Sequence, residues 1–352
     1  MALVDVKSLS RDQLEAFASQ LGQPAFRGRQ LFQWLYQKGA TDFDAMTNLP
    51  AGFRKTLSEE ASISALEEAN RQQSKDGTLK FLFKLSTGRH IESVLIPDFD
   101  EEGNAKRLTV CVSSQVGCAM GCTFCATGQM GFQQNLTVGE IFDQVWRLDQ
   151  VAREHFGRPV TNVVFMGMGE PLLNYTNVLN AVRALTHEDG LGLAPKRITI
   201  STVGLARRIQ QLADEHFGFH LAVSLHAPTD GKRSAIMPVN RNEQTDLKAL
   251  RESIQYYTKK TGQMVTYEYC MFDGYNDTQD DAKALGRVAG WAPCKINLIM
   301  YNPVDGLGFS RSAEDQLNAF IQILVKKGAR VTVRRSRGQD IDAACGQLAV
   351  QA

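Results

Sequence analysis

The chain has 352 residues, of which 43% are hydrophobic and 22% are charged, and its formal net charge is +1. This length and composition predict one large globular domain with a smaller addition, and the near-zero net charge excludes a protein whose whole surface attracts nucleic acid. No run approaches the ~18 apolar residues of a transmembrane helix, and the N-terminal MALVDVKSLSRDQLEAF lacks the apolar core of a signal peptide. We therefore expect a cytoplasmic protein without a membrane partner.

Residues 1–75 are expected to form a helical accessory domain. Apolar residues recur at helical spacing from Leu9 to Leu21 and from Gly28 to Lys38, and TDFDAMTNLPAGFRKTL predicts a turn followed by another helix. Residues 76–106 predict a β-hairpin and a linker, because two alternating runs in KFLFKLSTGRHIESVLIP flank the turn S-T-G-R and the charged DFDEEGNAKR follows them.

From residue 107 to residue 310 the pattern becomes a repeat of strand, loop and helix. The expected strands are RLTVCVS, TNVVFMG, RITIST, FHLAVSLH, TYEYCMF and KINLIMYN, most of them separated by amphipathic stretches such as VGEIFDQVWRLDQVAREHF. This order predicts an α/β fold with a parallel sheet covered by helices. Six units are too few for a closed eightfold barrel, so we expect a partial (β/α)6 barrel, with residues 311–352 as a C-terminal segment.

Several expected strands end in small or polar residues. They are Gly167 to Glu170, Ser201 and Thr202, Ser224 to His226, and Asn302. In βα barrels the carboxyl ends of the strands build the active site. We therefore expect these residues to converge at one mouth of the barrel.

The cysteines are distributed unevenly along the chain. Their odd number, seven, argues against a framework of structural disulfides. Four crowd into fifteen residues and three are scattered: Cys111, Cys118, Cys122 and Cys125 in the first group, and Cys270, Cys294 and Cys345 in the second. Such clustering indicates metal or redox chemistry.

The loop after the first expected strand contains Cys118-x3-Cys122-x2-Cys125. A zinc ion would require a fourth ligand, and an Fe–S cluster also commonly takes four. Cys111 is a possible fourth ligand, although it lies inside the preceding strand. Alternatively, three cysteines hold a [4Fe–4S] cluster, whose open iron can chelate the amino and carboxylate groups of S-adenosylmethionine (SAM). The turn G-M-G-E-P favours this alternative, because glycines let the backbone approach a ligand and Glu170 can receive an ammonium group.

These motifs together carry a resemblance to known proteins. A C-x3-C-x2-C motif on the first βα loop of a barrel resembles the radical SAM superfamily. Similarity to the RlmN/Cfr family of radical rRNA adenine methyltransferases extends over CVSSQVGCAMGCTFCATG, GFQQNLT, FMGMGEPLLNY, VSLHAP, CKINLIMYNP and RRSRGQDIDAACGQL, in this order. The N-terminal FRGRQLFQWLYQKGATDFDAMTNLP matches the accessory domain of that family, so the resemblance covers essentially the whole chain.

The resemblance implies one [4Fe–4S] cluster per chain and two molecules of SAM per turnover. The cluster ligands would be Cys118, Cys122 and Cys125. The SAM contacts would be Gly169, Glu170, Ser201, Ser224, Leu225, His226 and Asn302. From the residues alone, the two serines could equally be capping or turn residues, and the histidine a loop residue. Cys270 and Cys294 match no motif and are expected to pack in strands.

The resemblance also implies a role for Cys345 near the chain end. One SAM methylates this cysteine, and a second is cleaved to a 5′-deoxyadenosyl radical that takes a hydrogen from the S-methyl group. The carbon radical adds to the adenine ring, and Cys111 then attacks the Cys345 sulfur, releasing the methylated base with formation of a transient disulfide. Glu92 matches the base proposed for the family, and Cys111 is the alternative base. Without the resemblance, Glu92 would be taken for a surface carboxylate of the hairpin.

The tail retains Arg337, Gly338 and Asp340, as in the branch of the family that methylates C2 of adenine. The implied substrates are an adenosine in the peptidyl-transferase centre of 23S rRNA and the adenosine 3′ of the anticodon in tRNA. The alternative is C8 methylation of the same rRNA adenosine, and a radical SAM activase and a zinc-bearing RNA-binding module are rivals from other classes. The segment from Tyr301 to Phe309 departs from the N-P-x-P-G of many relatives.

Two local basic sets are expected to contact RNA phosphates. One comprises Lys326, Lys327, Arg330, Arg334, Arg335 and Arg337, and the other comprises Arg27, Arg29 and Lys38, near Trp34 and Tyr36. A structured RNA with a splayed adenine is the expected substrate. We further expect an electron donor of the flavodoxin or ferredoxin type and a monomeric enzyme.

Overall fold

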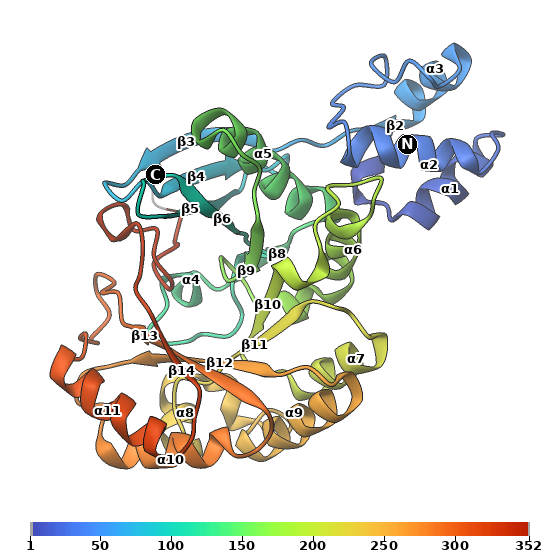
Figure 1. Cartoon of the computed structure of the whole chain (residues 1–352). Coiled ribbons are helices and arrows are strands. Elements are labelled where there is room, and N and C mark those ends of the chain that lie inside the picture. Colours follow the sequence, from blue (N-terminus) through green and yellow to red (C-terminus); the bar gives the residue numbers. More distant parts are fainter. Residues whose placement is uncertain (1–2, 351–352) are drawn as a thin grey trace.

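The computed structural model describes residues 3–350 of the chain. The N-terminal part is a helical module with three helices, which sits to one side of the larger body in Figure 1. Its elements are β1 (Val4–Asp5), α1 (Arg11–Gln20), α2 (Phe26–Tyr36), α3 (Ala51–Glu60) and β2 (Ala61–Ser62), with β1 and β2 paired in parallel. The expected helical character of this small domain is confirmed, but residues 67–73, inside its expected bounds of 1–75, form a strand of the larger sheet.

Local sequence explains how this module begins and closes. The Ser10 hydroxyl accepts a hydrogen bond from the Gln13 N–H, and the Gln13 side chain accepts one from the Ser10 N–H, which caps the first turn of α1. Helices α1 and α2 approach closely at Gly28, where a Cβ would overlap the backbone of Glu15. The two helices then bury apolar side chains such as Leu14 and Leu31 between them.

All six expected strands are present in a ten-stranded sheet (Figure 1). They are β6 (Ala105–Cys111), β9 (Asn162–Phe165), β10 (Ile198–Thr202), β11 (His220–Ser224), β12 (Val265–Met271) and β13 (Cys294–Met300), all parallel to their neighbours in this order. A seventh parallel strand, β14 (Val331–Arg334), pairs with β13. Its short sequence VTVR is half-exposed and ends in a charged residue, so the pattern of apolar residues did not predict this strand.

The expected hairpin is part of the same sheet. Its strands β4 (Leu79–Lys84) and β5 (His90–Phe99) are antiparallel, β5 pairs with β6, and β3 (Glu67–Gln73) forms the outer edge. Most of β5 is buried, which explains why this segment extends the sheet. The expected linker DFDEEGNAKR is shorter than predicted, because β5 continues to Phe99 and β6 begins at Ala105.

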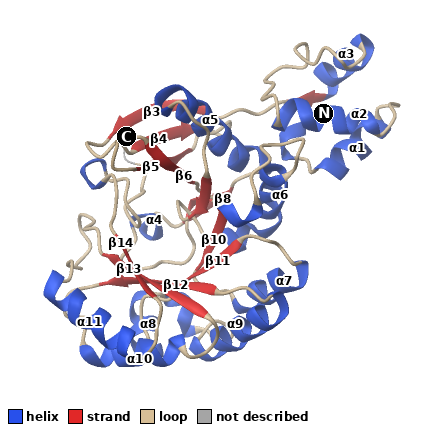
Figure 2. Cartoon of the chain, viewed as in Figure 1, coloured by secondary structure: helices blue, strands red, loops and turns tan. Residues whose placement is uncertain are grey.

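Helices line the outer face of the parallel strands, and the inner face is left to loops (Figure 2). The longer ones are α5 (Val138–Phe156), α6 (Tyr175–Thr186), α7 (Ala206–Glu215), α9 (Leu247–Thr261), α10 (Gln279–Ala289) and α11 (Glu314–Lys326). The short helices are α4 (Ala126–Gln129) and α8 (Asp230–Ile236), with 3-10 turns at Val6–Ser8, Pro171–Asn174, Pro195–Arg197, Pro238–Arg241 and Gln339–Ile341. Within residues 3–350, no helix has the length and apolar character needed to cross a membrane.

A second, small sheet supports the cysteine loop. Strands β7 (Gln115–Gly117) and β8 (Phe132–Asn135) pair in antiparallel fashion on either side of it. The Cys118 N–H donates to the Gly131 carbonyl at 3.0 Å, which closes the base of the loop. The fold therefore presents the loop as a tied structure at the mouth of the barrel.

A buried ion pair connects the N-terminal module to the barrel. The Lys7 Nζ lies 2.7 Å from Asp143 Oδ1 on α5, and both side chains are almost fully buried. The Tyr36 hydroxyl donates to the Lys7 carbonyl at 2.8 Å, and its ring packs edge-on against Phe142. These contacts fix the module against α5.

We expect the Asp143→Leu substitution to lower the free energy of unfolding by roughly 3 kcal/mol, because it leaves the buried Lys7 ammonium group without its partner. The double variant Lys7→Met/Asp143→Leu should recover most of this loss. Urea unfolding followed by tryptophan fluorescence measures both effects. As a control, Lys55→Met breaks an exposed pair with Glu59 and should cost ~1 kcal/mol at most. A single Asp143 variant as stable as the wild type would refute this account of the pair.

Candidate active site

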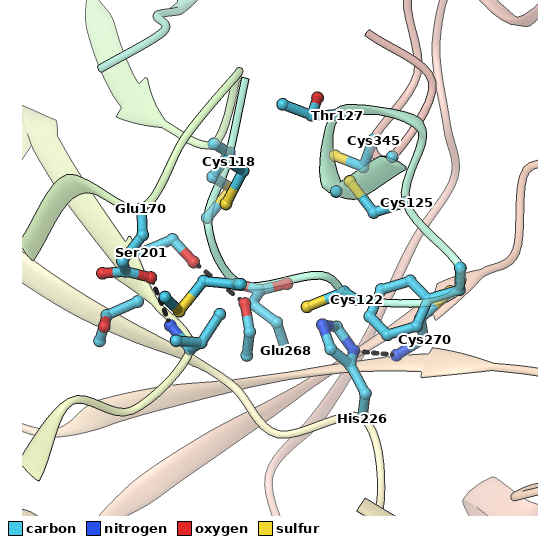
Figure 3. A pocket seen from close by; sticks show the side chains of 18 of the residues that line it. Cys118, Cys122, Cys125, Thr127, Glu170, Ser201, His226, Glu268, Cys270 and Cys345 are labelled. Atoms are coloured by element: carbon cyan, nitrogen blue, oxygen red, sulfur yellow. Dashed lines mark hydrogen bonds between the residues drawn. The ribbon is translucent and has the colours of Figure 1, made fainter. Parts of the chain in front are cut away.

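The carboxyl ends of the central strands open onto a cavity of about 160 Å³. Eight of the residues expected at the site line it: Cys118, Cys122, Cys125, Gly169, Glu170, Ser201, Ser224 and His226. Cys345 from the C-terminal tail also lines it, and Figure 3 shows its thiol beside that of Cys125. The fold thus brings together groups that are more than two hundred positions apart in the chain.

The cysteine loop has the chemistry of a metal site. Burial raises the pKa of Cys118 to about 12, and it also raises the pKa values of Cys122 and Cys125. Such thiols stay protonated at neutral pH unless a metal displaces the proton. Among residues 3–350 no group of three or more potential ligands is arranged around a single ion. A [4Fe–4S] cluster spreads its ligands over several irons, so three thiols around one cavity fit a cluster of this kind.

Glu170 is the acidic group next to the cysteine loop. It is almost completely buried, and its carboxylate accepts hydrogen bonds from the N–H groups of Leu172 (3.0 Å) and Val203 (2.8 Å). Burial raises its pKa to about 7, although these hydrogen bonds act in the opposite direction. A cationic ligand would therefore favour the ionised form, which suits the amino group of SAM.

Gly169 gives the turn before Glu170 its shape. Its φ of +97° is in the left-handed region, and a Cβ there would overlap the Gln115 side chain. The same Gln115 accepts a hydrogen bond from the Glu170 N–H through its Oε1 at 2.9 Å. The close packing of this turn against β7 therefore requires glycine.

Polar side chains from β10 and β11 form the facing wall of the cavity. The hydroxyl oxygens of Ser201 and Ser224 lie 3.4 Å apart on neighbouring strands. Two residues beyond the end of β11 lies His226, whose Nδ1 accepts a hydrogen bond from the Cys270 N–H at 3.0 Å. Burial lowers the pKa of His226 to about 3, so its ring is neutral and the proton lies on Nε2. This nitrogen faces the cavity in Figure 3 as a hydrogen-bond donor.

Two expected SAM contacts lie elsewhere. Leu225 and Asn302 are not among the described residues that line this cavity. The Leu225 side chain is buried in the core, and its N–H donates to the Glu268 carbonyl. The Asn302 side-chain amide donates to the Cys345 carbonyl at 3.2 Å, so it contacts the tail.

The tail that carries Cys345 is hydrogen-bonded to the cysteine loop. The Ala126 N–H donates to the Gly346 carbonyl at 2.8 Å, and the Thr127 hydroxyl donates to the Leu348 carbonyl at 2.5 Å. These bonds bracket the residues that follow Cys345. The thiol of Cys345 is therefore positioned by the same loop that carries Cys118, Cys122 and Cys125.

Further upstream, the tail is anchored to the turn between β3 and β4. The Gly338 N–H donates to Asp76 Oδ2 at 2.9 Å, and Asp340 accepts hydrogen bonds from the Ser74 hydroxyl (2.5 Å) and the Lys75 N–H (3.1 Å). The R-G-x-D element of the sequence thus fixes the start of the segment that leads to Cys345.

A second and larger cavity, of about 850 Å³, adjoins the first. We call the first the upper cavity and the second the lower cavity. Residues near the amino ends of the parallel strands line it, including Asn162, Thr199 and His220. Cys111 reaches it from β6, and Cys345 reaches it from the tail. Of the described residues, four line both cavities, namely Met166, Glu268, Arg334 and Cys345. Cys345 therefore lies where the two cavities meet.

Arg334 lines both cavities, although the sequence analysis assigned it to a set of phosphate-binding residues. It is the last residue of β14, a strand that the sequence pattern did not predict. Burial raises the pKa of Cys111 to about 12, with a further increase from Cys345, and the charge of Arg334 lowers it. The pKa of Arg334 is raised in turn by its neighbours Cys345, Glu268 and Cys111. The guanidinium thus favours the thiolate form of Cys111.

Glu268 is a junction residue that the sequence reasoning missed. It is buried on β12, and its Oε2 accepts a hydrogen bond from the Asn297 amide at 2.8 Å. Burial raises its pKa, while Arg334 and Asn297 act in the opposite direction. The signal was an acidic residue inside the apolar strand TYEYCMF, since a buried carboxylate needs a reason to be there.

Glu92, the expected base, is not among the described residues that line either cavity. It is buried on β5, with its Oε1 3.4 Å from Lys80 Nζ. Its Oε2 accepts hydrogen bonds from the N–H groups of Ala349 (2.9 Å) and Val350 (3.3 Å). The carboxylate therefore contacts the tail beyond Cys345.

The expected basic sets separate in the structure. Arg335 and Arg337 line the second cavity, together with Arg107 and Lys295. On the N-terminal module, Lys38 lies over the Trp34 ring at 3.8 Å, Arg27 lies over Phe26 at 4.7 Å, and Arg29 pairs with Glu15. Basic side chains thus outnumber acidic ones in the lining of the lower cavity, although Asp98 pairs with both Arg107 and Arg337.

Comparisons with known proteins agree with this arrangement. Residues 4–63 match the family described as "Ribosomal RNA large subunit methyltransferase N-terminal domain", and residues 112–285 match the "Radical SAM superfamily". The chain is 60% identical to a "Probable dual-specificity RNA methyltransferase RlmN" of Salinibacter ruber, over 98% of this chain and 94% of that protein. It is 46% identical to a "Dual-specificity RNA methyltransferase RlmN" of Nitratidesulfovibrio vulgaris (strain DSM 19637 / Miyazaki F), over 98% and 94% of the two chains.

A solved structure shares the whole fold. The crystal structure of a radical SAM methyltransferase from Sphaerobacter thermophilus is 44% identical and superposes with a TM-score of 0.90, over 99% of this chain and 100% of that chain. The two family matches fall on the helical module and on the barrel, and the relatives span nearly the full length. The chain belongs to the RlmN family of radical SAM RNA methyltransferases.

Proposed function

We propose that this enzyme methylates C2 of adenosine in RNA and that Cys345 carries the methyl group. The observation that supports this most strongly is the position of Cys345 at the junction of two cavities. A carrier has to receive a methyl group on one side and deliver it on the other. The proposed substrates are 23S rRNA and tRNA, in keeping with relatives named dual-specificity RNA methyltransferases.

The upper cavity is the proposed cofactor side. Cys118, Cys122 and Cys125 would hold one [4Fe–4S] cluster, and Glu170 would hold the amino group of SAM, which is used twice per turnover. When bound, the cluster and SAM supply the methyl group and, with an electron from a flavodoxin or ferredoxin-type protein, the radical chemistry. The serine hydroxyls and the His226 Nε2–H offer further polar contacts on the facing wall.

A thiol carrier answers a chemical difficulty. The C2 carbon of adenine has no nucleophilic lone pair, so it cannot attack the methyl group of a sulfonium ion directly. The Cys345 sulfur can attack it, and the resulting S-methyl carbon, after loss of a hydrogen atom, can bond to C2. The ring would then lose the C2 proton and one electron to regain its aromaticity, and that electron would return to the cluster, when bound. Asn302, Ala126 and Thr127 hold the backbone around Cys345 through these steps.

Cys111 is proposed to release the product. Its thiolate would attack the Cys345 sulfur and form a disulfide with it, the bond from that sulfur to the methylene carbon would break, and the carbon would take up a proton. The electron donor would then reduce the disulfide before the next turnover. Cys111 shares the lower cavity with Cys345, whereas Glu92 is engaged with Lys80 and the tail. We therefore assign removal of the C2 proton to Cys111 as well.

The lower cavity is the proposed entrance for RNA. Its volume of about 850 Å³ is within the range of ligand sites. Its basic side chains, Arg107, Lys295, Arg334, Arg335 and Arg337, outnumber its two acidic ones, Asp98 and Glu268. An adenosine inside a duplex could not reach Cys345, so the base has to leave its stack. Phosphates that flank the extruded nucleotide would then contact the basic rim.

Incubation of the reconstituted enzyme with SAM, a reductant and either a 23S rRNA fragment or tRNA should give 2-methyladenosine. Mass spectrometry of digested RNA, with both synthetic isomers as standards, identifies the product. Finding 8-methyladenosine would overturn the proposed position, and finding unmodified RNA in both cases would overturn the proposed substrates.

Substitution of the two cysteines should give opposite outcomes. Cys345→Ala should abolish methylation because the carrier is missing, whereas Cys111→Ala should accumulate a covalent protein–RNA adduct because release is blocked. Denaturing gels of the enzyme with labelled RNA resolve the two. Cys294→Ala is the matched control. This thiol at the start of β13 donates a hydrogen bond to the Ala289 carbonyl, so it should be dispensable for activity. Full activity of either site variant would refute the mechanism.

Arg334 should set the pH dependence of product release. Without its charge the pKa of Cys111 rises further, so Arg334→Met should slow decay of the adduct about tenfold near neutral pH for each pKa unit. The rate should recover as the pH is raised. Single-turnover decay of the adduct across pH measures this, and Arg335→Met, which removes the neighbouring charge, should weaken RNA binding without shifting the profile. An unshifted profile for Arg334→Met would contradict the assignment.

A further inference from the structure

The environment of Glu92 differs from that of a free catalytic base. One carboxylate oxygen faces the Lys80 ammonium group at 3.4 Å, and the other accepts the N–H groups of Ala349 and Val350. Lys80 and Glu92 are both buried, so neither charge is screened by water. The ion pair and the two amides together occupy both oxygens.

The backbone of Glu92 is fixed as firmly as its side chain. Glu92 lies opposite Leu82 in the pairing of β4 with β5, and its carbonyl accepts a hydrogen bond from the Ser113 hydroxyl at 2.6 Å. The carboxylate therefore projects from a rigid strand towards the tail. A group held in this way is suited to fixing another segment in place.

The tail is held at two points beyond Cys345. Near the thiol, the cysteine loop binds the Gly346 and Leu348 carbonyls. Farther on, the carboxylate of Glu92 binds the N–H groups of the next two residues, Ala349 and Val350. Without the second point, Ala349 and Val350 would be free to move, and the attachment of the tail beyond Cys345 would rest on the cysteine loop alone.

We propose that Glu92 is a positioning residue that latches the end of the C-terminal tail and, together with the hydrogen bonds from the cysteine loop, holds Cys345 between the two cavities. Its part in the reaction is then to keep the carrier thiol in reach of SAM and of adenine, and the C2 proton leaves through another group. The importance of that position rests on the proposed function, whereas the latch itself is a property of the tail that can be measured without substrate.

The latch and a base make different demands on the side chain. A latch needs a hydrogen-bond acceptor, which glutamine also supplies, whereas a base needs an ionisable group. A single Glu92 substitution would leave Lys80 buried and unpaired, which is itself destabilising. The comparison therefore uses two double variants without charge, Lys80→Met/Glu92→Gln and Lys80→Met/Glu92→Leu, which differ only in the acceptor.

Hydrogen exchange of the intact protein, followed by mass spectrometry of C-terminal peptides, reports on the tail directly. In the Leu variant we expect exchange at Ala349 and Val350 to accelerate by about 10- to 100-fold, as for the loss of hydrogen bonds to a charged acceptor. In the Gln variant exchange should remain within about threefold of the wild type. Unchanged protection in the Leu variant would overturn the latch.

Methylation of Cys345 by SAM in the absence of RNA gives an independent measurement, because this step removes no proton from adenine. It should slow markedly in the Leu variant and stay near the wild-type rate in the Gln variant, which should also methylate RNA. If the Gln variant methylates Cys345 normally but fails to methylate RNA, Glu92 is the base and the inference is wrong. If the wild-type protein itself forms no S-methylcysteine, the proposed function fails, and hydrogen exchange still decides whether the latch exists.

Discussion

Two hydrogen bonds join the cysteine loop to the tail, from the Ala126 N–H to the Gly346 carbonyl and from the Thr127 hydroxyl to the Leu348 carbonyl. The second spans 221 positions of the chain. Two other residues line both cavities from barrel strands, whereas the carrier thiol reaches them from a tail without regular secondary structure. Such a tail needs other contacts to place the thiol accurately. The two hydrogen bonds to the cysteine loop supply these contacts, because they fix the tail to the same backbone that would carry the cluster.

The sequence anticipated those parts of the molecule that depend on local pattern. The six barrel strands follow from apolar runs, and the helices between them follow from amphipathic spacing and capping residues. The spacing of Cys118, Cys122 and Cys125 placed a metal-binding loop after the first strand, and the turn before Glu170 placed an acidic group next to it. In each case the residues that carry the chemistry lie within about ten positions of one another in the chain.

The parts that the sequence did not anticipate depend on contacts between distant segments. Arg334 looked like a member of a basic run, because nothing nearby reveals that β14 directs it towards Cys111 and Cys345. Asn302 lies at a strand end as expected, but its side-chain amide donates a hydrogen bond to the tail. Glu92 is fixed in the sheet, yet what its carboxylate contacts depends on where the chain terminus runs. A tail without regular secondary structure gives no periodic signal from which its path could be predicted.

The anchors at Gly338 and Asp340 have a kinetic consequence. They tether the segment to the turn between β3 and β4, so Cys345 is confined to a small volume next to Cys111. Confinement of this kind makes the meeting of the two sulfurs a first-order event with a high effective concentration. Small thiols in solution would compete poorly with it, since they have to enter the cavity by diffusion. The short tether thus directs sulfur exchange to the internal partner, and it makes the rate of that exchange independent of how much enzyme is present.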